Sequence, residues 1–317
     1  MAIIENWLPA SRENYEFILS IWKWFPVVRS SSQQGFTLNL ASIANNKQKA
    51  YSTQWMISWY GMGKTSVQSP LNIPGRIAWL TMEVPGFVTL LYIMNTLPTQ
   101  HGIEDLPWQN KTLAGLFCLH YVYRAVLFPV LQPSMSPIHA VVWSMALVFQ
   151  FFNATCLGSW LAAYGPTTEA EWNSAAQFSN GGSSVLQFAT GLVVFYVGLT
   201  ANYFCDEELR EIRRAEQRRQ ERLAREQGRP VGSIEKHYSV PNNGLFRYML
   251  YPHYFSEWIE WLGFWIAAGV GCTPARCFLV NEIFAMLPRA VSGKKWYIEK
   301  FGEDKIKGKY AIIPGVW

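Results

Sequence analysis

The sequence predicts an all-α membrane protein, folded as a bundle of about seven transmembrane helices. Several apolar segments approach the ~20 residues that a helix needs to cross the hydrocarbon core of a bilayer. Of the 317 residues, 50% are hydrophobic and 15% are charged, whereas a soluble domain carries about 25% charged residues. Fifteen Trp and fifteen Tyr residues suit the two membrane interfaces, where amphipathic rings gather. We therefore expect a multi-pass helical bundle in the lipid bilayer.

Seven apolar segments are the candidate spans. In chain order they cover residues 15–28, 77–97, 113–131, 138–164, 184–205, 254–270 and 273–290. The first is the weakest because Lys23 and Pro26 interrupt it, and an interfacial or re-entrant helix is the alternative there. Residues 206–227, after the fifth span, repeat Glu and Arg at spacings of three and four. This pattern predicts a solvated helix that continues the fifth span and ends near Gly228.

The distribution of Lys and Arg predicts the orientation of the bundle. The segments 29–76, 206–236 and 294–309 hold most of these residues, and the connections 98–111 and 165–182 hold few. Basic residues collect in cytoplasmic connections. Seven spans with a lumenal N-terminus and a cytoplasmic C-terminus place all three basic segments in the cytoplasm. We expect residues 1–317 to form a single integral-membrane domain, in which 206–236 are a charged cytoplasmic helix and loop.

Composition also argues against several other classes of protein. The five cysteines are odd in number and most lie in or beside apolar runs, so neither a disulfide framework nor a metal site is expected. The net charge of +5 comes without a basic patch that alternates with exposed aromatic rings, so nucleic-acid binding is not expected. No obligate protein partner is evident from the sequence.

Two of the spans carry ionisable side chains, Glu83 in the second and His120, Tyr121 and Arg124 in the third. A charge near the bilayer centre costs roughly 2.5–3.5 kcal/mol, so such residues usually face the protein interior and mark a site. In an apolar setting a carboxyl group favours its neutral form, and a neutral carboxyl and a phenol can both donate to one carbonyl oxygen. Glu83 and Tyr121 are therefore a candidate clamp for a developing enolate. The alternative is that Glu83 only tethers two helices by pairing with Arg124 or His120.

A second polar group is expected at the cytoplasmic edge of the bundle. Asn202 and Asp206 close the fifth span, and further cationic, acidic and phenolic side chains lie near the ends of the sixth and seventh spans. Together these types of side chain suit a phosphate-bearing cofactor. The chain lacks a GxGxxG or P-loop pattern, so a nucleotide would need a non-Rossmann pocket. Each residue taken singly is more typical of an interfacial anchor.

With these residues in hand, the chain resembles the steroid 5α-reductase family (3-oxo-5α-steroid 4-dehydrogenases) from about Gly63 to its C-terminus. The similar stretches are residues 78–87, 115–124, 202–213, 243–264 and 296–314, so 237–317 corresponds to the family's C-terminal signature region. The resemblance implies a seven-helix membrane bundle that binds NADPH, in the endoplasmic reticulum. It also implies that Glu83 and Tyr121 hold the carbonyl oxygen of a lipid enone such as a 3-oxo-Δ4-steroid, while hydride from NADPH reduces the conjugated double bond. The implied nucleotide contacts are Arg124, Asn202, Asp206, Arg213, Tyr238, Glu257, Trp261, Arg289 and Tyr297.

Several positions depart from the family pattern. The loop 132–137 and the stretch 238–241 each lack an expected arginine, an expected asparagine is His253, an expected histidine is Gly293, and an expected tyrosine is Phe128. These departures leave three alternatives open. One is a reductase of trans-2-enoyl-CoA or of a polyprenal-type lipid. Another is a membrane methyltransferase of the isoprenylcysteine type that uses S-adenosylmethionine, since the residues from Tyr251 to Glu257 resemble its cofactor motif. The third is a non-catalytic protein that keeps the fold.

Overall fold

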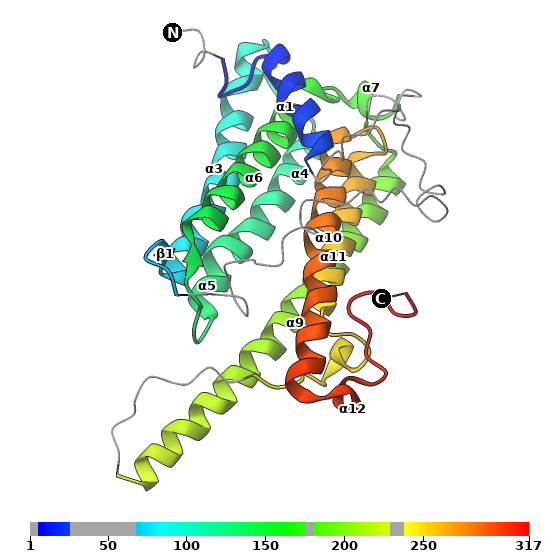
Figure 1. The fold of residues 1–317 in the computed structure, drawn as a ribbon. Helices are drawn as coiled ribbons and strands as arrows, with labels where there is room; N and C mark the ends of the chain where they lie inside the picture. Colours follow the sequence, from blue (N-terminus) through cyan, green and yellow to red (C-terminus); the bar gives the residue numbers. More distant parts are fainter. Residues whose placement is uncertain (1–5, 26–67, 175–180, 229–237, 317) are drawn as a thin grey trace, which may run out of the picture.

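The computed structural model describes residues 6–25, 68–174, 181–228 and 238–316, and this part of the chain is mostly helical. Helices occur at all seven predicted segments. They are α1 (Arg12–Trp24), α3 (Gly75–Gln100), α4 (Trp108–Tyr121) with α5 (Phe128–Leu131), α6 (Ala140–Ser159), α9 (Val185–Glu226), α10 (Pro252–Ala268) and α11 (Thr273–Phe301). Short helices α7 (Glu169–Trp172), α12 (Glu303–Ile306) and a 3-10 turn (Gly244–Arg247) lie in the connections. Figure 1 shows α3, α4 and α6 side by side, with α10 and α11 forming a second pair.

Four of the described helices are long and apolar enough to cross a membrane. They run over Gly75–Gln100, Trp108–Leu131, Ala140–Tyr164 and Val185–Glu226. Their outward faces carry large apolar side chains such as Leu91, Val130 and Val193, as expected of helices that face lipid. The protein is therefore an integral membrane protein.

The bounds of several helices differ from the predicted spans. Helix α1 begins three residues before the predicted span because the side chain of Ser11 accepts a hydrogen bond from the backbone of Asn14 and caps the helix there. The predicted residues 26–28 lie outside the described residues, as do most of the basic segment 29–76 and residues 229–236 of the charged segment. The first two residues of the fourth predicted span, Ile138–His139, form strand β2, which pairs antiparallel with β1 (Asn72–Ile73). Helix α11 continues to Phe301, beyond the predicted apolar segment.

Two π-helical segments interrupt the expected helical periodicity. Val122–Leu127 joins α4 to α5, and Trp160–Tyr164 follows α6. A π-helical turn shifts the phase of the side chains that follow it, and such turns are frequent at functional sites. The first lies directly after Tyr121 and contains Arg124, so the side chains that follow it are rotated relative to those of a regular α-helix.

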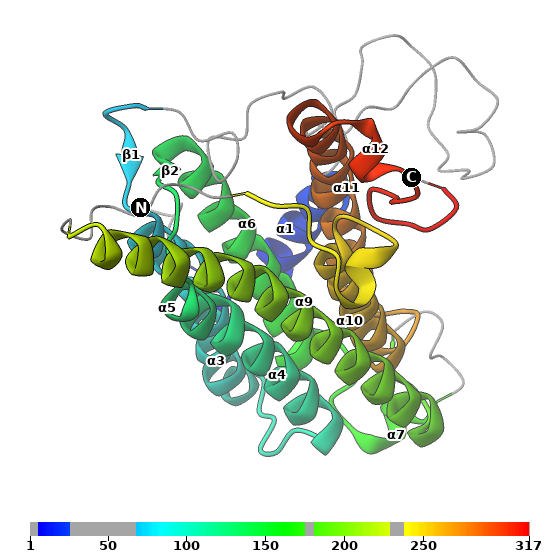
Figure 2. The same ribbon diagram turned by 90° about the horizontal axis from the view of Figure 1, so that it is seen from below.

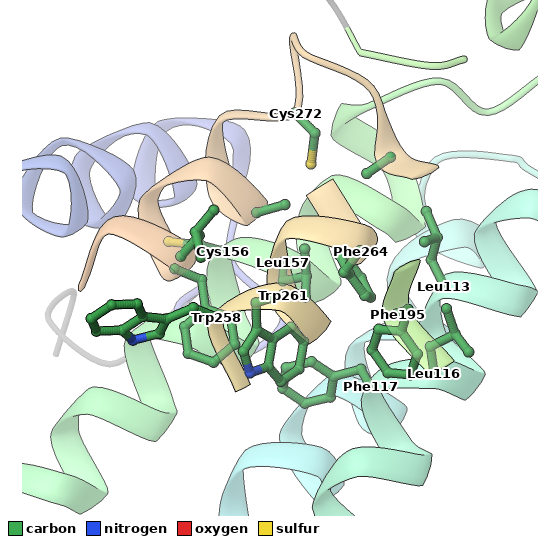
Figure 3. Close-up of a cluster of buried hydrophobic side chains, with 14 of the residues drawn as sticks. Leu113, Leu116, Phe117, Cys156, Leu157, Phe195, Trp258, Trp261, Phe264 and Cys272 are labelled. Carbon is green, nitrogen blue, oxygen red and sulfur yellow. The ribbon is translucent and has the colours of Figure 1, made fainter. Parts of the chain in front are cut away.

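Helices α9 and α10 pack so closely that only glycine fits at their contact. A Cβ atom on Gly198 would lie 2.2 Å from the backbone nitrogen of Glu260, and one on Gly263 would lie 2.2 Å from that of Phe195. Small residues allow membrane helices to approach in this way. The contact fixes the carboxyl-bearing face of α10 against α9. Figure 3 shows Trp261 of α10 at the centre of the apolar cluster, beside Phe117 and Phe195.

The predicted charged extension of the fifth span is confirmed. Helix α9 runs unbroken from Val185 to Glu226, and Figure 1 shows its second half projecting beyond the bundle. Figure 2, turned to look from below, shows the same helix running along the length of the molecule. Salt bridges within the helix stabilise its projecting part, among them Arg214 with Glu207 at 2.5 Å and Arg219 with Glu216 at 2.8 Å.

Candidate active site

Glu83 lies on α3 at its contact with α6, where an amide side chain meets it. The Nε2 group of Gln150 donates a short hydrogen bond to Oε2 of Glu83. Gly86, one turn further along α3, makes room for this amide, since a Cβ atom there would lie 2.5 Å from Oε1 of Gln150. The Glu83 carboxyl is thus half-buried between two membrane-spanning helices and faces protein, as the sequence predicted for an ionisable group in a span.

Tyr121 ends α4 and is 2% exposed. Its ring packs against that of Phe117, with the centroids 4.5 Å apart, and lies 6.3 Å from the ring of Trp261. The Nδ2 group of Asn153, on α6, lies 3.5 Å from the phenol oxygen and donates to it. The phenol is within electrostatic range of the carboxyl groups of Glu83, Glu257 and Glu282. Helices α3, α4 and α6 therefore bring Glu83 and Tyr121 into one polar cluster.

His120 joins α4 to the carboxyl groups of α10 rather than to Glu83. Its Nδ1 atom lies 2.8 Å from Oε1 of Glu260, and its Nε2 atom lies 3.8 Å from Oε1 of Glu257. The amide of Asn202, on α9, donates to the other oxygen of Glu257 at 3.3 Å. This chain of contacts connects α4, α10 and α9 next to Trp261, whose ring centroid lies 4.7 Å from that of the imidazole.

Arg124 turns toward α9. Its guanidinium lies 3.7 Å from Oδ2 of Asp206 and over the rings of Trp79 and Phe128, at 5.0 and 4.7 Å from their centroids. The hydroxyl of Tyr123 donates to the same Asp206 oxygen at 3.2 Å. Arg124 and His120 remain within electrostatic range of Glu83, but their ion-pair partners are Asp206 and Glu260. The tether that we considered for Glu83 is therefore not the arrangement found.

A fully buried arginine supports this group from α9. Arg210 donates to the phenol oxygen of Tyr123 at 3.2 Å and to Glu207 at 2.7 Å. Its guanidinium also lies 5.5 Å from the ring centroid of Tyr203. The Tyr123 hydroxyl thus accepts from Arg210 while it donates to Asp206, and this relay fixes the carboxylate that faces Arg124.

The remaining predicted cofactor residues lie at the end of the molecule where α9 leaves the bundle. Tyr297 is within electrostatic range of Arg213 and Tyr238, and the ring of Trp296 lies 5.1 Å from Tyr238 and 5.2 Å from Tyr297. The predicted residues Arg213, Tyr238 and Tyr297 therefore form a second group, with Trp296 between the two tyrosines. Arg289 is half-buried on α11, eight residues before Tyr297, and within electrostatic range of Glu282.

Two arginines from other parts of the chain contact the loop 132–137, which lacks the expected arginine. Arg213 donates to Oε1 of Gln132 at 2.9 Å, and Arg76, at the start of α3, donates to the Gln132 carbonyl at 2.6 Å. Two guanidinium groups therefore stand at residues 132–137 although this loop has no basic residue of its own.

Sequence reasoning missed four side chains of the polar cluster: Gln150, Asn153, Tyr123 and Glu282. Gln150 and Asn153 are polar residues three apart in the apolar span 138–164, and Glu282 is a carboxyl in the span 273–290. The same signal that identified Glu83, a polar group inside an apolar segment, would have found these three. Tyr123 carries the same signal as Tyr121, a phenol in the span 113–131. Its partners Asp206 and Arg210 were not predictable, because they come from a helix more than eighty residues away.

Some polar atoms of the cluster have no hydrogen-bond partner in the part of the chain that the structure describes. They are Oε1 of Gln150, Oδ1 of Asn153, Oε2 of Glu260 and Nε1 of Trp261. A buried polar atom without a partner costs about 1–3 kcal/mol. These four atoms lie near Tyr121 and His120 and could be satisfied by a polar ligand.

Comparison with known proteins confirms the resemblance found in the sequence. The profile of the family described as 3-oxo-5-alpha-steroid 4-dehydrogenase matches residues 135–317. The chain is 30% identical to 3-oxo-5-alpha-steroid 4-dehydrogenase 1 of Rattus norvegicus over 80% of this chain and 85% of that protein. It is 28% identical to a steroid 5-alpha-reductase of Solanum lycopersicum over 82% and 88%, and 32% identical to an uncharacterized protein of Schizosaccharomyces pombe over 80% and 89%. The chain belongs to the 3-oxo-5-alpha-steroid 4-dehydrogenase family, whose members are oxidoreductases that act on CH–CH groups.

Proposed function

We propose that this protein is an NADPH-dependent membrane reductase that reduces the conjugated double bond of a lipid enone, in the first place a 3-oxo-Δ4-steroid. Family membership supports the reaction class, and the names of the relatives from rat and tomato support a steroid. The observation that carries the proposal is the approach of Glu83 and Tyr121 between α3, α4 and α6. The methyltransferase alternative does not hold, because the family is one of oxidoreductases.

In this proposal Glu83 and Tyr121 act on the carbonyl oxygen of the enone. Both are held inside the bundle, where low dielectric strengthens their hydrogen bonds to a developing oxyanion. NADPH, when bound, supplies the hydride that adds to the β-carbon. The two donors stabilise the negative charge that then collects on oxygen, and a proton taken up at the α-carbon completes the saturated ketone. The apolar walls around Tyr121 exclude water from the enolate.

The donor set near α9 suits a dinucleotide. Arg124 and Arg213 offer guanidinium groups for phosphates, and Asn202, Asp206 and Glu257 offer an amide and carboxylates for ribose hydroxyls and a carboxamide. Nε1 of Trp261 and Oε2 of Glu260 have no hydrogen-bond partner among the described residues, so they offer a donor and an acceptor beside this set. Tyr238, Tyr297 and Arg289 complete the proposed contacts, and Arg76 and Arg213 at residues 132–137 offset the arginine that the loop lacks.

We also propose the seven-span topology, with a lumenal N-terminus, a cytoplasmic C-terminus and a location in the endoplasmic reticulum, within a single domain of residues 1–317. Figure 1 shows the projecting arm of α9, β1 and the C-terminal residues toward one end of the molecule, and α7 toward the other. Arg76, the arginines of α9 and the lysines of 294–309 gather toward the first end, while Glu169 and Glu171 lie on α7. This asymmetry supports a cytoplasmic first end.

The test is reduction by the purified protein in nanodiscs with NADPH and, separately, a 3-oxo-Δ4-steroid, a trans-2-enoyl-CoA and a polyprenal. We expect a mass gain of two hydrogens in the steroid, with deuterium from labelled NADPH at the β-carbon. Glu83→Gln should lower kcat by about 10²–10³-fold, the usual effect of removing one oxyanion donor. The control is Glu104→Gln in the exposed turn after α3, which should leave kcat unchanged. If the protein reduces only the acyl-CoA or only the polyprenal, that compound class takes the place of the steroid as the proposed substrate. Full activity of Glu83→Gln would overturn the proposed mechanism.

A further inference from the structure

We infer that two amide side chains of α6, those of Gln150 and Asn153, set the direction in which Glu83 and Tyr121 donate their hydrogen bonds. They are positioning residues, because each acts through a member of the pair. The inference rests on the proposed function, in which Glu83 and Tyr121 hold the carbonyl oxygen of the substrate.

Gln150 decides which oxygen of Glu83 carries the proton. Its Nε2 group donates to Oε2 of Glu83, so Oε2 acts as the acceptor of the carboxyl group. In a neutral carboxylic acid the carbonyl oxygen is the stronger acceptor, and the other oxygen carries the O–H donor. With Oε2 engaged by the amide, the proton is on Oε1, and this oxygen is the one that donates to a substrate carbonyl.

Asn153 has the corresponding effect on the phenol. Its Nδ2 group donates to the hydroxyl oxygen of Tyr121, at the long separation of 3.5 Å. A hydroxyl that accepts an N–H hydrogen bond keeps its own hydrogen for another acceptor. Both members of the pair are therefore engaged from α6 as acceptors, which leaves both free to act as donors toward a shared oxygen.

The geometry of α6 and α3 supports a common role for the two amides. Residues three apart lie on the same face of a helix, so Gln150 and Asn153 are presented together. Gly86 of α3 makes room for the Gln150 amide, whose Oε1 would be 2.5 Å from a Cβ atom there.

The far oxygens of both amides lack partners among the described residues. Apolar side chains at positions 150 and 153 would fill the same space without two orphaned acceptors. What the amides add over apolar side chains is the pair of N–H donors that they aim at Glu83 and Tyr121.

The experiment compares Gln150→Leu and Asn153→Leu with the wild-type protein by two readouts. The first is kinetic: kcat for the 3-oxo-Δ4-steroid should fall about 10- to 100-fold, as when an outer residue that orients a functional group is lost, while KM changes little. The second needs no NADPH: the ultraviolet absorption band of the bound steroid enone shifts to the red when its oxygen accepts hydrogen bonds. We expect this shift in the wild type and a smaller shift in both variants.

Two further variants separate positioning from packing. In Gly86→Ala the new methyl group would displace the Gln150 amide. This variant should reproduce the loss of kcat and of the red shift although both amide side chains are still present. Thr155→Val, an isosteric change at a buried hydroxyl of the same helix, should change neither. Where Gln150→Leu fails to fold, Gln150→Met provides the same test with a more adaptable side chain.

The outcomes distinguish this inference from the function on which it rests. If the wild type neither binds nor reduces the steroid, or Glu83→Gln is fully active, the proposed function fails and the inference fails with it. If Glu83→Gln is inactive while the variants at 150 and 153 keep wild-type kcat and the wild-type absorption band, the proposed function stands and the positioning role is refuted.

Discussion

The imidazole of His120 and the carboxyl group of Glu260 form a buried pair that joins α4 to α10, with Nδ1 2.8 Å from Oε1. Both side chains are almost completely shielded, and Glu260 sits where Gly198 of α9 presses against the backbone of α10. The pair therefore sits where three helices meet, beside the ring of Trp261.

Removing one partner of this pair should destabilise the protein strongly. Glu260→Ala leaves the His120 imidazole without its acceptor in a buried position, for which we expect a loss of about 3–5 kcal/mol in the free energy of unfolding. The matched control is Glu211→Ala on the exposed arm of α9, where Arg218 and Arg214 lose a solvent-facing partner and the loss should stay below about 1 kcal/mol. Unfolding in a single detergent by heat and by denaturant measures both. Equal losses in the free energy of unfolding at the two positions would show that the His120–Glu260 pair does not stabilise the fold.

Asp206→Asn, which keeps the size of the side chain and an oxygen that can accept from Tyr123, should weaken NADPH binding. The carboxylate accepts from Tyr123 and faces Arg124, so its loss releases the guanidinium that we propose for a phosphate. A hydrogen bond to a charged group contributes about 1.5–3 kcal/mol, which predicts a Kd raised about 10- to 100-fold. Fluorescence of bound NADPH measures the Kd, and Glu211→Gln serves as the control. An unchanged Kd in Asp206→Asn would remove this residue from the proposed nucleotide contacts.

Gly293→Ala should be poorly tolerated. A Cβ atom at this position of α11 would lie 1.7 Å from the hydroxyl of Tyr251, and the buried ring behind it leaves little room to move. Overpacking of this kind costs about 1–3 kcal/mol. Gly115→Ala on the outer face of α4, where nothing lies within 4 Å of the new atom, is the matched control and should not destabilise. The melting temperatures of the two variants decide the point, and a Gly293→Ala protein as stable as the wild type would contradict this packing.

The stability of the α7 turn should fall in acid. The Glu171 carboxylate accepts from the backbone N–H groups of Thr167 and Thr168 at 2.7 and 3.1 Å, and these hydrogen bonds lower its pKa. A depressed folded-state pKa gives stability that is present above the pKa of the unfolded chain, about 4.3 for Glu. This stability is lost as pH falls through the lower, folded-state value.

The measurement is the difference in unfolding free energy between the wild type and Glu171→Gln from pH 7 to pH 3. The difference should favour the wild type at pH 7 and shrink below about pH 4. A difference that does not depend on pH would show that the capping carboxylate is not the titrating group.

The sequence was sufficient to predict where the helices lie, because long apolar runs favour helices. By length and apolarity, four of the described helices can cross a bilayer. The sequence was also sufficient for the charged half of α9, since Glu and Arg at spacings of three and four favour a solvated helix whatever surrounds it. The first segment was placed less accurately because its start depends on a single cap at Ser11. The π-helical turn after Tyr121 was not predictable, since its sequence carries no local signal of a shifted register.

The candidate site was predicted in part, for a related reason. Glu83 and Tyr121 were identified from polarity within apolar spans, which is a local property. The pairing of Glu83 with Gln150 and of Tyr121 with Asn153 was not predictable, because the faces that neighbouring helices turn toward each other depend on glycine contacts such as Gly86 with Gln150 and Gly198 with Glu260. His120 illustrates the limit: its sequence context allowed Glu83 as a partner, and the fold gave it Glu260.

The close seating of Gly198 on α10 has a consequence for how this chain can vary in length. Asn202 and Asp206 follow Gly198 by one and two turns of the same unbroken helix. One residue inserted between Gly198 and Asn202 would therefore rotate both side chains by about 100°, Asn202 away from Glu257 and Asp206 away from Arg124. An insertion beyond Arg214 would turn only the projecting arm. Relatives can therefore differ freely in the reach of that arm, whereas the count of residues from Gly198 to Asp206 must stay fixed.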